Sequence, residues 1–289
     1  MKIKESELIL NADGSVYHLN LKPENISDTI LFVGDQDRVE KITNHFDTIE
    51  FSTQKREFKT QTGTYKGKRI TVMSTGIGPD NIDIVMNELD ALVNIDLENR
   101  VLKKEIKILD IIRIGTSGSL QADIPVDSFV IGTHGLDLNG MLHFYELNDI
   151  TNPRLEDEFI KFTNWNSNKA RPIIIENSKE LERKFESNQT FKGITATAGG
   201  FYGPQGRVLR LPIEDPELNN KMDTFNFKGN RISNLEMETS VIYGLSKLLG
   251  HRALSLNAII ANRPNGTFSK DSKMVVERLI TYTLDKLVE

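Results

Sequence analysis

The amino-acid sequence predicts an α/β fold: a single domain with a central mixed, largely parallel β-sheet flanked by helices. Short runs rich in Ile, Val and Thr alternate with longer segments of helical periodicity, which is the pattern of such a sheet. The 289 residues, 38% hydrophobic and 27% charged, are enough to bury one large core. No linker rich in Pro, Gly or Ser divides the chain, so we predict one domain over residues 1–289, with residues 1–16 as an N-terminal extension.

The expected strands and helices differ in length and in the spacing of their apolar residues. The strands are short and rich in β-branched residues, which suit a pleated surface. In chain order they are TILFVG (29–34), RITVMST (69–75), KILDIIRIG (107–115), DSFVIGT (127–133), RPIII (171–175), GITATA (193–198) and ALSLNAIIAN (253–262). The helices repeat apolar residues at helical spacing, as at Val241 and Leu245, and are expected over 37–46, 79–93, 153–165, 178–187, 237–249 and 271–288. The charged segment 94–107 is predicted to be a helix end and a surface connection.

Charge and cysteine content exclude several function classes. A net charge of −5 argues against a general nucleic-acid-binding protein, which would carry a basic face. The absence of cysteine excludes disulfides, thiol catalysis and thiolate zinc sites. The sequence has no signal-peptide pattern and no run of roughly 18 apolar residues. We therefore expect a soluble cytoplasmic protein that acts on neither membranes nor nucleic acids.

Arg113 is the first candidate functional residue, because it interrupts the apolar run LDIIRIG of an expected strand. A guanidinium so close to a core is costly unless an anion compensates it. Gly-containing turns are predicted after three strands, at 33–38, 74–81 and 113–120, and such turns bring backbone N–H groups to an oxyanion. Phosphate is the predicted anion, bound by Arg113 and the loop of Thr116. For Arg38 and Arg56 a solvated surface position is the alternative.

Two further groups of residues suggest a nucleoside. Glu236 and Glu238 are two positions apart, so on an extended segment both carboxylates point to one side and suit the vicinal diol of a ribose. The alternatives are acidic residues that begin a helix, or a glycosidase-type acid/base pair. In the loop TATAGGFYGPQGRVLRLP, Phe201 offers a ring for stacking, and Gln205 and Arg207 offer polar groups for a heterocycle edge. The alternative for this loop is a solvated Gly/Pro-rich segment.

From about residue 17 onward the sequence resembles the nucleoside phosphorylase family, which includes uridine phosphorylases and the hexameric purine nucleoside phosphorylases. The resemblance lies in GDQDRVEKI, REF, STGIG, RIGTSG, FYGPQGR, LEMET and NAIIANR, in this order. It implies a nucleoside phosphorylase-like fold and reversible phosphorolysis of a nucleoside. Phosphate would be a co-substrate, no organic cofactor would be needed, and the protein would self-associate, as dimers or hexamers in this family.

The resemblance also implies roles for individual residues. Phosphate would be bound by Gly34, Arg38, Arg113 and Thr116, with Arg56 supplied by a neighbouring subunit. Ribose would be bound by Glu236, Met237 and Glu238, with His18 of the adjacent protomer at the 5′-hydroxyl. The base would be bound by Phe201, Gln205 and Arg207. Arg113, Thr116, Gln205 and Arg207 would be the catalytic residues. A potassium ion between subunits would be bound by Glu57 and Ser74.

The predicted base is a pyrimidine. Purine-specific members of the family use an aspartate after a late strand, but this chain reads NAIIANRPNGTF, with no aspartate before Asp271. FYGPQGR retains the glutamine and the arginine that read uracil in the uridine enzymes. The expected reaction is therefore conversion of uridine and phosphate to uracil and ribose 1-phosphate, in pyrimidine salvage. The alternatives are a purine nucleoside phosphorylase and a non-catalytic nucleoside-binding protein.

Overall fold

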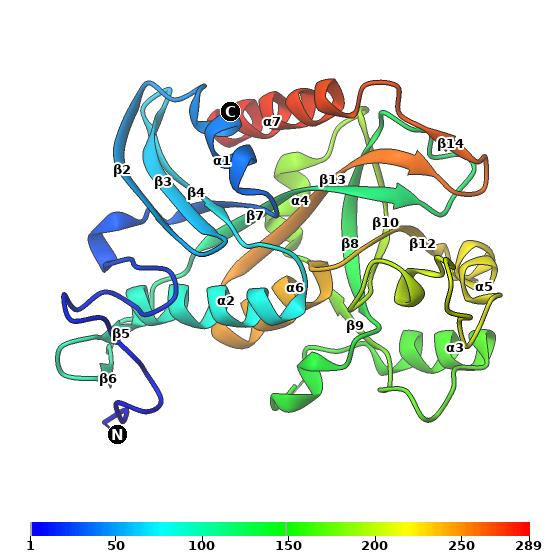
Figure 1. Cartoon of the computed structure of the whole chain (residues 1–289), viewed down its shortest axis with the longest axis horizontal. Helices are drawn as coiled ribbons and strands as arrows, with labels where there is room; N and C mark the ends of the chain where they lie inside the picture. Colours follow the sequence, from blue (N-terminus) through cyan, green and yellow to red (C-terminus); the bar gives the residue numbers. More distant parts are fainter. Residues whose placement is uncertain (1, 148) are drawn as a thin grey trace.

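A mixed 12-stranded sheet runs through the computed structural model, which describes residues 2–147 and 149–289 (Figure 1). Its main strand order is β11-β12-β10-β8-β13-β7-β1-β4-β3-β2, with β14 added to β13 and β9 to β8. The strands are β1 (Thr29–Val33), β2 (Thr48–Lys55), β3 (Phe58–Tyr65), β4 (Lys68–Ser74), β7 (Asp110–Ser119), β8 (Phe129–Asp137), β9 (Ile173–Glu176), β10 (Thr190–Thr197), β11 (Asn226–Phe227), β12 (Asn230–Glu236), β13 (Arg252–Asn262) and β14 (Thr267–Phe268). A separate hairpin pairs β5 (Ile95–Asp96) with β6 (Val101–Leu102).

Strand β13 lies in the middle of this sheet. It pairs in parallel with β7 on one side and antiparallel with β8 on the other. Parallel pairings extend outward from it, through β7 and β1 to β4, and from β8 through β10 to β12. The predicted fold class is confirmed: the protein is an α/β domain with a mixed central sheet whose inner strands are largely parallel.

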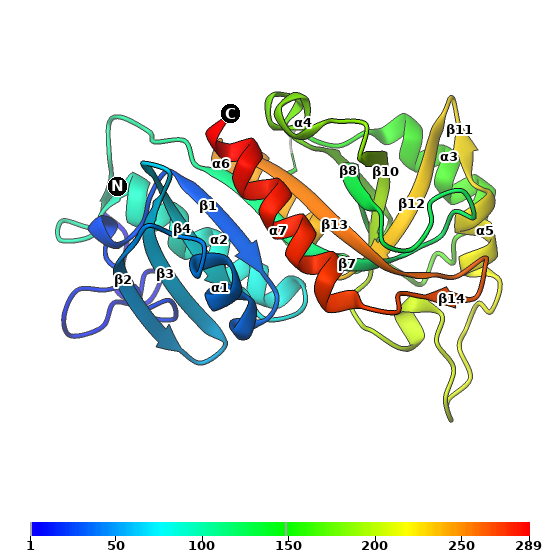
Figure 2. The ribbon, with the colours of Figure 1, turned by 90° about the horizontal axis from the view of Figure 1, so that it is seen from above.

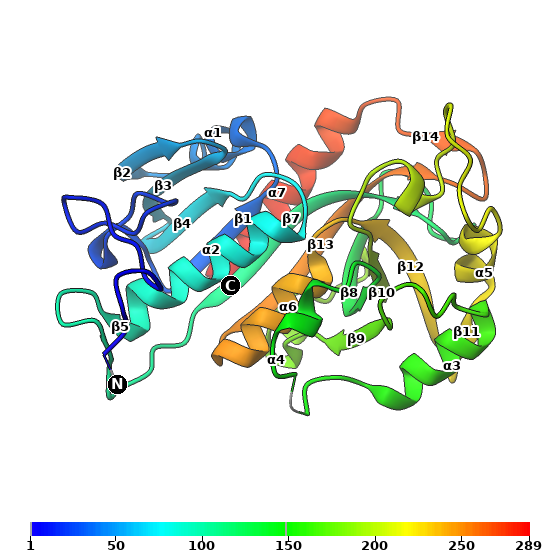
Figure 3. The same ribbon diagram turned by 60° about the horizontal axis from the view of Figure 1, so that its bottom comes forward.

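Helices cover both faces of the central strands. Successive side chains of a strand point to opposite faces of the sheet, so apolar strands such as β7 present apolar side chains on both. On one face Ile111 of β7 packs with α2 (Pro79–Asn94) and α6 (Thr239–Leu249), which lie side by side in Figure 3. On the other face Ile112 packs with a cluster from α1 (Gln36–Thr43), α4 (Lys179–Phe185) and α7 (Ser272–Val288), and Figure 2 shows α7 crossing that face. Helices α3 (Pro153–Thr163) and α5 (Leu218–Thr224) cover the far part of the sheet. Arg113 lies on the α2–α6 face, two positions after Ile111.

The predicted strands and helices are present, with ends shifted by a few residues, and several elements were not predicted. The elements that were not predicted lack a recognisable apolar pattern in sequence. They are strands β2, β3 and β12, helix α5 and the short strands. The segment 94–107 contains the β5–β6 hairpin as well as a helix end. The predicted turn at 113–120 is wrong, because β7 continues through Ser119, paired with β13 to its end and with β12 as well at Gly118 and Ser119. Glycines 115 and 118 are therefore strand residues.

The first residues are attached to the rest of the chain. The backbone N–H of Ile3 donates to the carbonyl of Arg100 beside the β5–β6 hairpin, and Val16 is fully buried. Residue 1 of the predicted extension lies outside the described residues. None of the helices in 2–147 and 149–289 is long and apolar enough to cross a membrane.

Candidate active site

A pocket of about 790 Å³ lies where β1, β4, β7 and β12 end, which is where open α/β sheets bind ligands. It collects most of the predicted site residues, although they come from segments far apart in the chain. From the phosphate, ribose and base sets it is lined by Gly34, Arg38, Arg113, Thr116, Phe201, Gln205, Arg207, Glu236, Met237 and Glu238. Glu57 also lines it, whereas His18, Arg56 and Ser74 of the same chain do not.

Arg113 is buried and is compensated by carboxylates of the chain itself. The residue is 6% exposed, and its Nη2 donates to Glu238 and lies 3.5 Å from Oε2 of Glu236. Burial alone would lower the pKa of Arg113, but these two carboxylates outweigh it and the pKa is raised. The inference that phosphate must be the anion beside Arg113 is therefore corrected: two glutamates already face it. Phosphate binding by Arg113 stays a prediction.

Glu236 and Glu238 converge as the sequence suggested, because β12 ends at Glu236 and α6 begins just after Glu238. The carboxylate of Glu236 accepts the backbone N–H groups of Glu238 and Thr239, so it caps the first turn of α6. Burial raises the pKa of Glu236, and Arg113 opposes this shift. Glu238 also accepts the N–H of Gly78 at 2.8 Å, which joins the loop after β4 to the start of α6. Both readings of the pair, helix start and functional cluster, thus describe the same residues.

Arg38 supplies a second positive charge at the same end of the pocket. It follows the N-cap Asp35 on α1, and its Nη1 donates to the carbonyl of Ile114 at 3.2 Å. Burial lowers the pKa of Arg38, and the charge of Arg113 lowers it further. Arg38 makes no ion pair within the described residues, so its charge is available to an anion in the pocket. Thr116 of β7 lines the same region.

Gly115 leaves room for the guanidinium of Arg113. A Cβ atom at position 115 would lie 1.6 Å from Nη1 of Arg113 and 2.7 Å from Oδ1 of Asn257. We expect Gly115→Ala to displace the guanidinium from Glu238 and to raise the KM for phosphate more than tenfold if the proposed activity below is present. Phosphate-dependent rates and thermal melts of Gly115→Ala and of a matched control, Gly67→Ala, test this. Gly67 lies in an open turn where a Cβ meets no atom within 4 Å, although its φ of 79° costs some stability in the control.

The other end of the pocket contains the predicted base-binding residues. The guanidinium of Arg207 lies 3.8 Å from the ring centroid of Phe201, so one face of that ring is covered. Arg207 donates to Oε1 of Gln205 at 2.6 Å, and Gln205 is 3% exposed. These contacts bring Phe201, Gln205 and Arg207 together as predicted.

Arg263, which the sequence reasoning missed, contacts Gln205 at the base end without lining the pocket. It donates to the backbone carbonyl of Gln205 at 2.7 Å and lies 3.4 Å from Oε1 of the same residue. Burial, followed by repulsion from Arg207, lowers the pKa of Arg263 to about 10. The sequence presented Arg263 only as part of the stretch that lacks an aspartate. The signal for Arg263 in the sequence was its position directly after an apolar strand, where open α/β sheets bind ligands.

The remaining predicted residues lie elsewhere in the chain. His18 is half-buried, with Nδ1 2.6 Å from Oε1 of Glu88, and Arg56 is exposed in the β2–β3 turn with a φ of 55°. Ser74 is buried, and its Oγ donates to the carbonyl of Glu57 at 2.5 Å and accepts from the N–H of Lys59. No group of three or more His, Cys, Asp or Glu side chains in the described part of the chain could hold a metal ion. The roles of His18, Arg56, Glu57 and Ser74 stay predictions.

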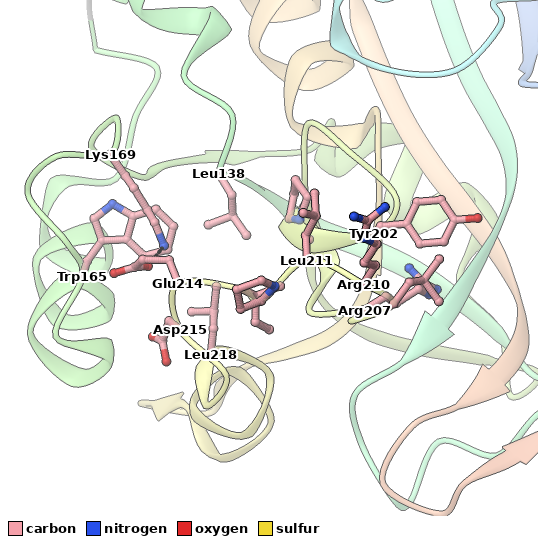
Figure 4. A pocket seen from close by; sticks show the side chains of 15 residues that line it. Leu138, Trp165, Lys169, Tyr202, Arg207, Arg210, Leu211, Glu214, Asp215 and Leu218 are labelled. Carbon is pink, nitrogen blue, oxygen red and sulfur yellow. Dashed lines mark ion pairs between the residues drawn. The ribbon is translucent and has the colours of Figure 1, made fainter.

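A second pocket of about 740 Å³ lies beside the base end of the first (Figure 4). It is mainly apolar, with Trp165 on one side and the loop that carries Arg210 and Leu211 on the other. An ion pair of Lys169 with Glu214 at 2.5 Å holds one end of that loop. Of the predicted site residues, Arg207 alone lines this pocket as well. The predicted site residues are therefore concentrated in the first pocket.

Comparisons with known proteins identify the family of the chain. A family model described as the phosphorylase superfamily matches residues 28–288. A uridine phosphorylase of Thermococcus kodakarensis is 29% identical over 275 residues, 93% of this chain and 85% of the relative. A purine nucleoside phosphorylase of DeoD type 2 from Shewanella oneidensis is 27% identical over 274 residues, 94% of this chain and 98% of the relative. The crystal structure of a Trypanosoma brucei nucleoside phosphorylase that shows uridine phosphorylase activity superposes with a TM-score of 0.86 at 28% identity, over 97% of this chain and 99% of the other.

Proposed function

Because the chain belongs to the phosphorylase superfamily, we propose that it is a uridine phosphorylase, which converts uridine and phosphate to uracil and ribose 1-phosphate. The observation that carries the proposal is the single pocket that joins two arginines at one end to Gln205 and Arg207 at the other. Two buried glutamates lie beside Arg113 in the same pocket, and their carboxylates suit the hydroxyls of a ribose. Relatives named uridine phosphorylase support the choice of substrate.

The proposed mechanism is a displacement at C1′ of the ribose. The C1′–N1 bond breaks while an oxygen of phosphate approaches the opposite face of C1′, and the bonding electrons leave with uracil. Arg38 and Arg113 hold the phosphate near C1′, so much of the acceleration comes from positioning. Negative charge develops on the departing uracil, where Gln205 and Arg207 stabilise it. Glu238 accepts hydrogen bonds from the ribose hydroxyls.

The direct test is an ultraviolet assay of base release. Purified protein is incubated with uridine, with and without phosphate, and the same is done with inosine. We expect uracil release that depends on phosphate. Release without phosphate would indicate a nucleosidase, and binding without release would indicate a nucleoside-binding protein. The purine alternative is kept in the assay because DeoD-type purine nucleoside phosphorylases are similar to this chain at 27% identity.

The proposal includes self-association with shared active sites, in the cytoplasm and in pyrimidine salvage. It is supported by the position of His18 and Arg56 outside the pocket of their own chain. It also includes a potassium ion at a subunit interface. The adjacent oxygens of Ser74 and Glu57 suit a hard cation, but one chain supplies only part of a shell of six to eight oxygens.

Shared sites predict complementation between inactive variants. His18→Ala and Glu238→Ala proteins should each have low activity, because each lacks one part of every site. After subunit exchange, mixed oligomers should contain some sites with both residues intact, and part of the activity should return. Activity is measured before and after exchange, with mixing verified by differently tagged subunits. Verified mixed oligomers that stay inactive would show that each site is built from one chain.

A further inference from the structure

Asn257 is a fully buried polar residue in the middle of the apolar strand β13. It stands opposite Gly115 in the β7–β13 register, on the sheet face where Arg113 lies. Its Oδ1 accepts a hydrogen bond of 3.1 Å from Nη1 of Arg113. A buried amide in such a strand is costly unless both of its polar ends are bonded, so its partners show what it does.

The amide of Asn257 is fixed in one orientation by a chain of hydrogen bonds. Its Nδ2 donates to Oγ of Ser255 at 3.2 Å, and the same Oγ accepts from the hydroxyl of Thr239 at 2.8 Å. The backbone N–H of Thr239 in turn donates to Glu236, which faces Arg113. A closed circuit thus connects Arg113, Asn257, Ser255, Thr239 and Glu236. The Ser255 contact turns Nδ2 away from Arg113 and presents Oδ1 to it.

The contact with Asn257 adds an acceptor to Arg113 without adding a charge. Glu236 and Glu238 already place two carboxylates beside the guanidinium. An aspartate at position 257 has the same shape as asparagine but would present a third carboxylate. With Arg38 counted beside Arg113, an anionic substrate would then meet two guanidinium groups and three carboxylates, which is a net negative charge. The neutral amide therefore anchors Nη1 without adding a negative charge that would repel an anion from the pocket.

We infer that Asn257 is a positioning residue that holds Arg113 for the phosphate substrate through an uncharged contact. This inference rests on the proposed phosphorolysis. Asn257 does not line the pocket, so it acts through Arg113. Loss of Asn257 should consequently weaken phosphate binding and leave nucleoside binding unchanged. Loss of a residue needed only for folding would affect both substrates alike.

The experiment compares Asn257→Asp and Asn257→Ala with the wild type in steady-state kinetics with uridine and phosphate. We expect Asn257→Asp to raise the KM for phosphate by more than tenfold, with the KM for uridine within twofold of the wild type. We expect a smaller rise, about threefold to tenfold, for Asn257→Ala, which loses the anchor but adds no charge. The diagnostic result is that Asn257→Asp raises the KM for phosphate more than Asn257→Ala does. Aspartate is the closer match to asparagine in shape, so a loss of packing alone would give the opposite order.

The matched control is Asn177→Asp, which also buries a new carboxylate but lies outside the pocket. It should leave the KM for phosphate unchanged. Phosphate binding to each folded variant is also measured by titration calorimetry, so the result does not depend on turnover. The inference is overturned if an active wild type and Asn257→Asp have the same phosphate KM and affinity, or if both KM values rise together. Absence of phosphate-dependent uracil release in the wild type would instead refute the proposed function.

Discussion

Replacing Arg113 by alanine is expected to lower kcat/KM for phosphate by about thirtyfold to a thousandfold. The loss corresponds to roughly 2–4 kcal/mol, the range for deletion of a buried charge-assisted contact at a reacting group. The variant should also be less stable, because Glu236 and Glu238 would remain buried without the guanidinium that compensates them. Phosphate kinetics and thermal melts of the purified variant measure the two effects separately.

Two comparisons make the Arg113 experiment specific. Arg113→Lys should recover only part of the activity, because lysine restores the charge but not the planar fork that contacts both Glu238 and Asn257. Arg69→Ala is the control, since Arg69 bonds Glu50 and two backbone carbonyls away from the pocket. A folded Arg113→Ala protein with the phosphate kinetics of the wild type would remove Arg113 from the phosphate site.

Uridine is expected to be cleaved at least about a hundred times faster than cytidine, measured as kcat/KM, because the bonding groups of the base end match uracil. Oε1 of Gln205 already accepts from Arg207, so its Nε2 and the remaining guanidinium N–H groups are donors. Uracil presents two carbonyl acceptors to these donors. Cytosine has an amino donor in place of O4, which would leave donors facing donors.

A side-by-side phosphorolysis assay with uridine, cytidine, inosine and adenosine tests this selectivity. Inosine and adenosine should be poor substrates, because the end of β13 and the residue after it are Asn262 and Arg263, where an acid would be needed. Arg207→Ala should lower kcat more than it weakens nucleoside binding, since the leaving-group charge develops mainly in the transition state. If inosine outruns uridine, the pyrimidine assignment is wrong and the purine alternative replaces it.

The central elements of the fold could be predicted because they bury apolar residues in regular patterns. Strands β1, β7 and β13 are almost continuous apolar runs, and α2, α6 and α7 have apolar stripes. Strands β2 and β3 escaped prediction because they lie at the sheet edge, where TIEFSTQK and FKTQTGTY carry many polar residues. The extension of β7 through Gly115 and Gly118 escaped it because the pairing of those residues depends on strands more than 100 positions away.

The residue types of the site were predicted more completely than the contacts between those residues. An arginine inside an apolar strand pointed to a buried anion, and the structure places Arg113 beside carboxylates. Which anion it meets could not be read from sequence, since Glu238 lies 125 positions away. Asn257 carried the same signal, a polar residue in an apolar strand, and was overlooked because an amide is less costly to bury than a charge.

The central place of β13 has a consequence for folding. The strand fills the gap between β7 and β8, yet it spans residues 252–262 and follows both of them by more than 100 residues. Without β13 the sheet divides into two parts with apolar edges, which within the described residues pair directly only between β7 and β12. The arginines of the phosphate end belong to one partial sheet and the base loop follows a strand of the other. The two parts of the pocket therefore come together only when β13 pairs with both β7 and β8, and pairings so distant in the chain slow folding.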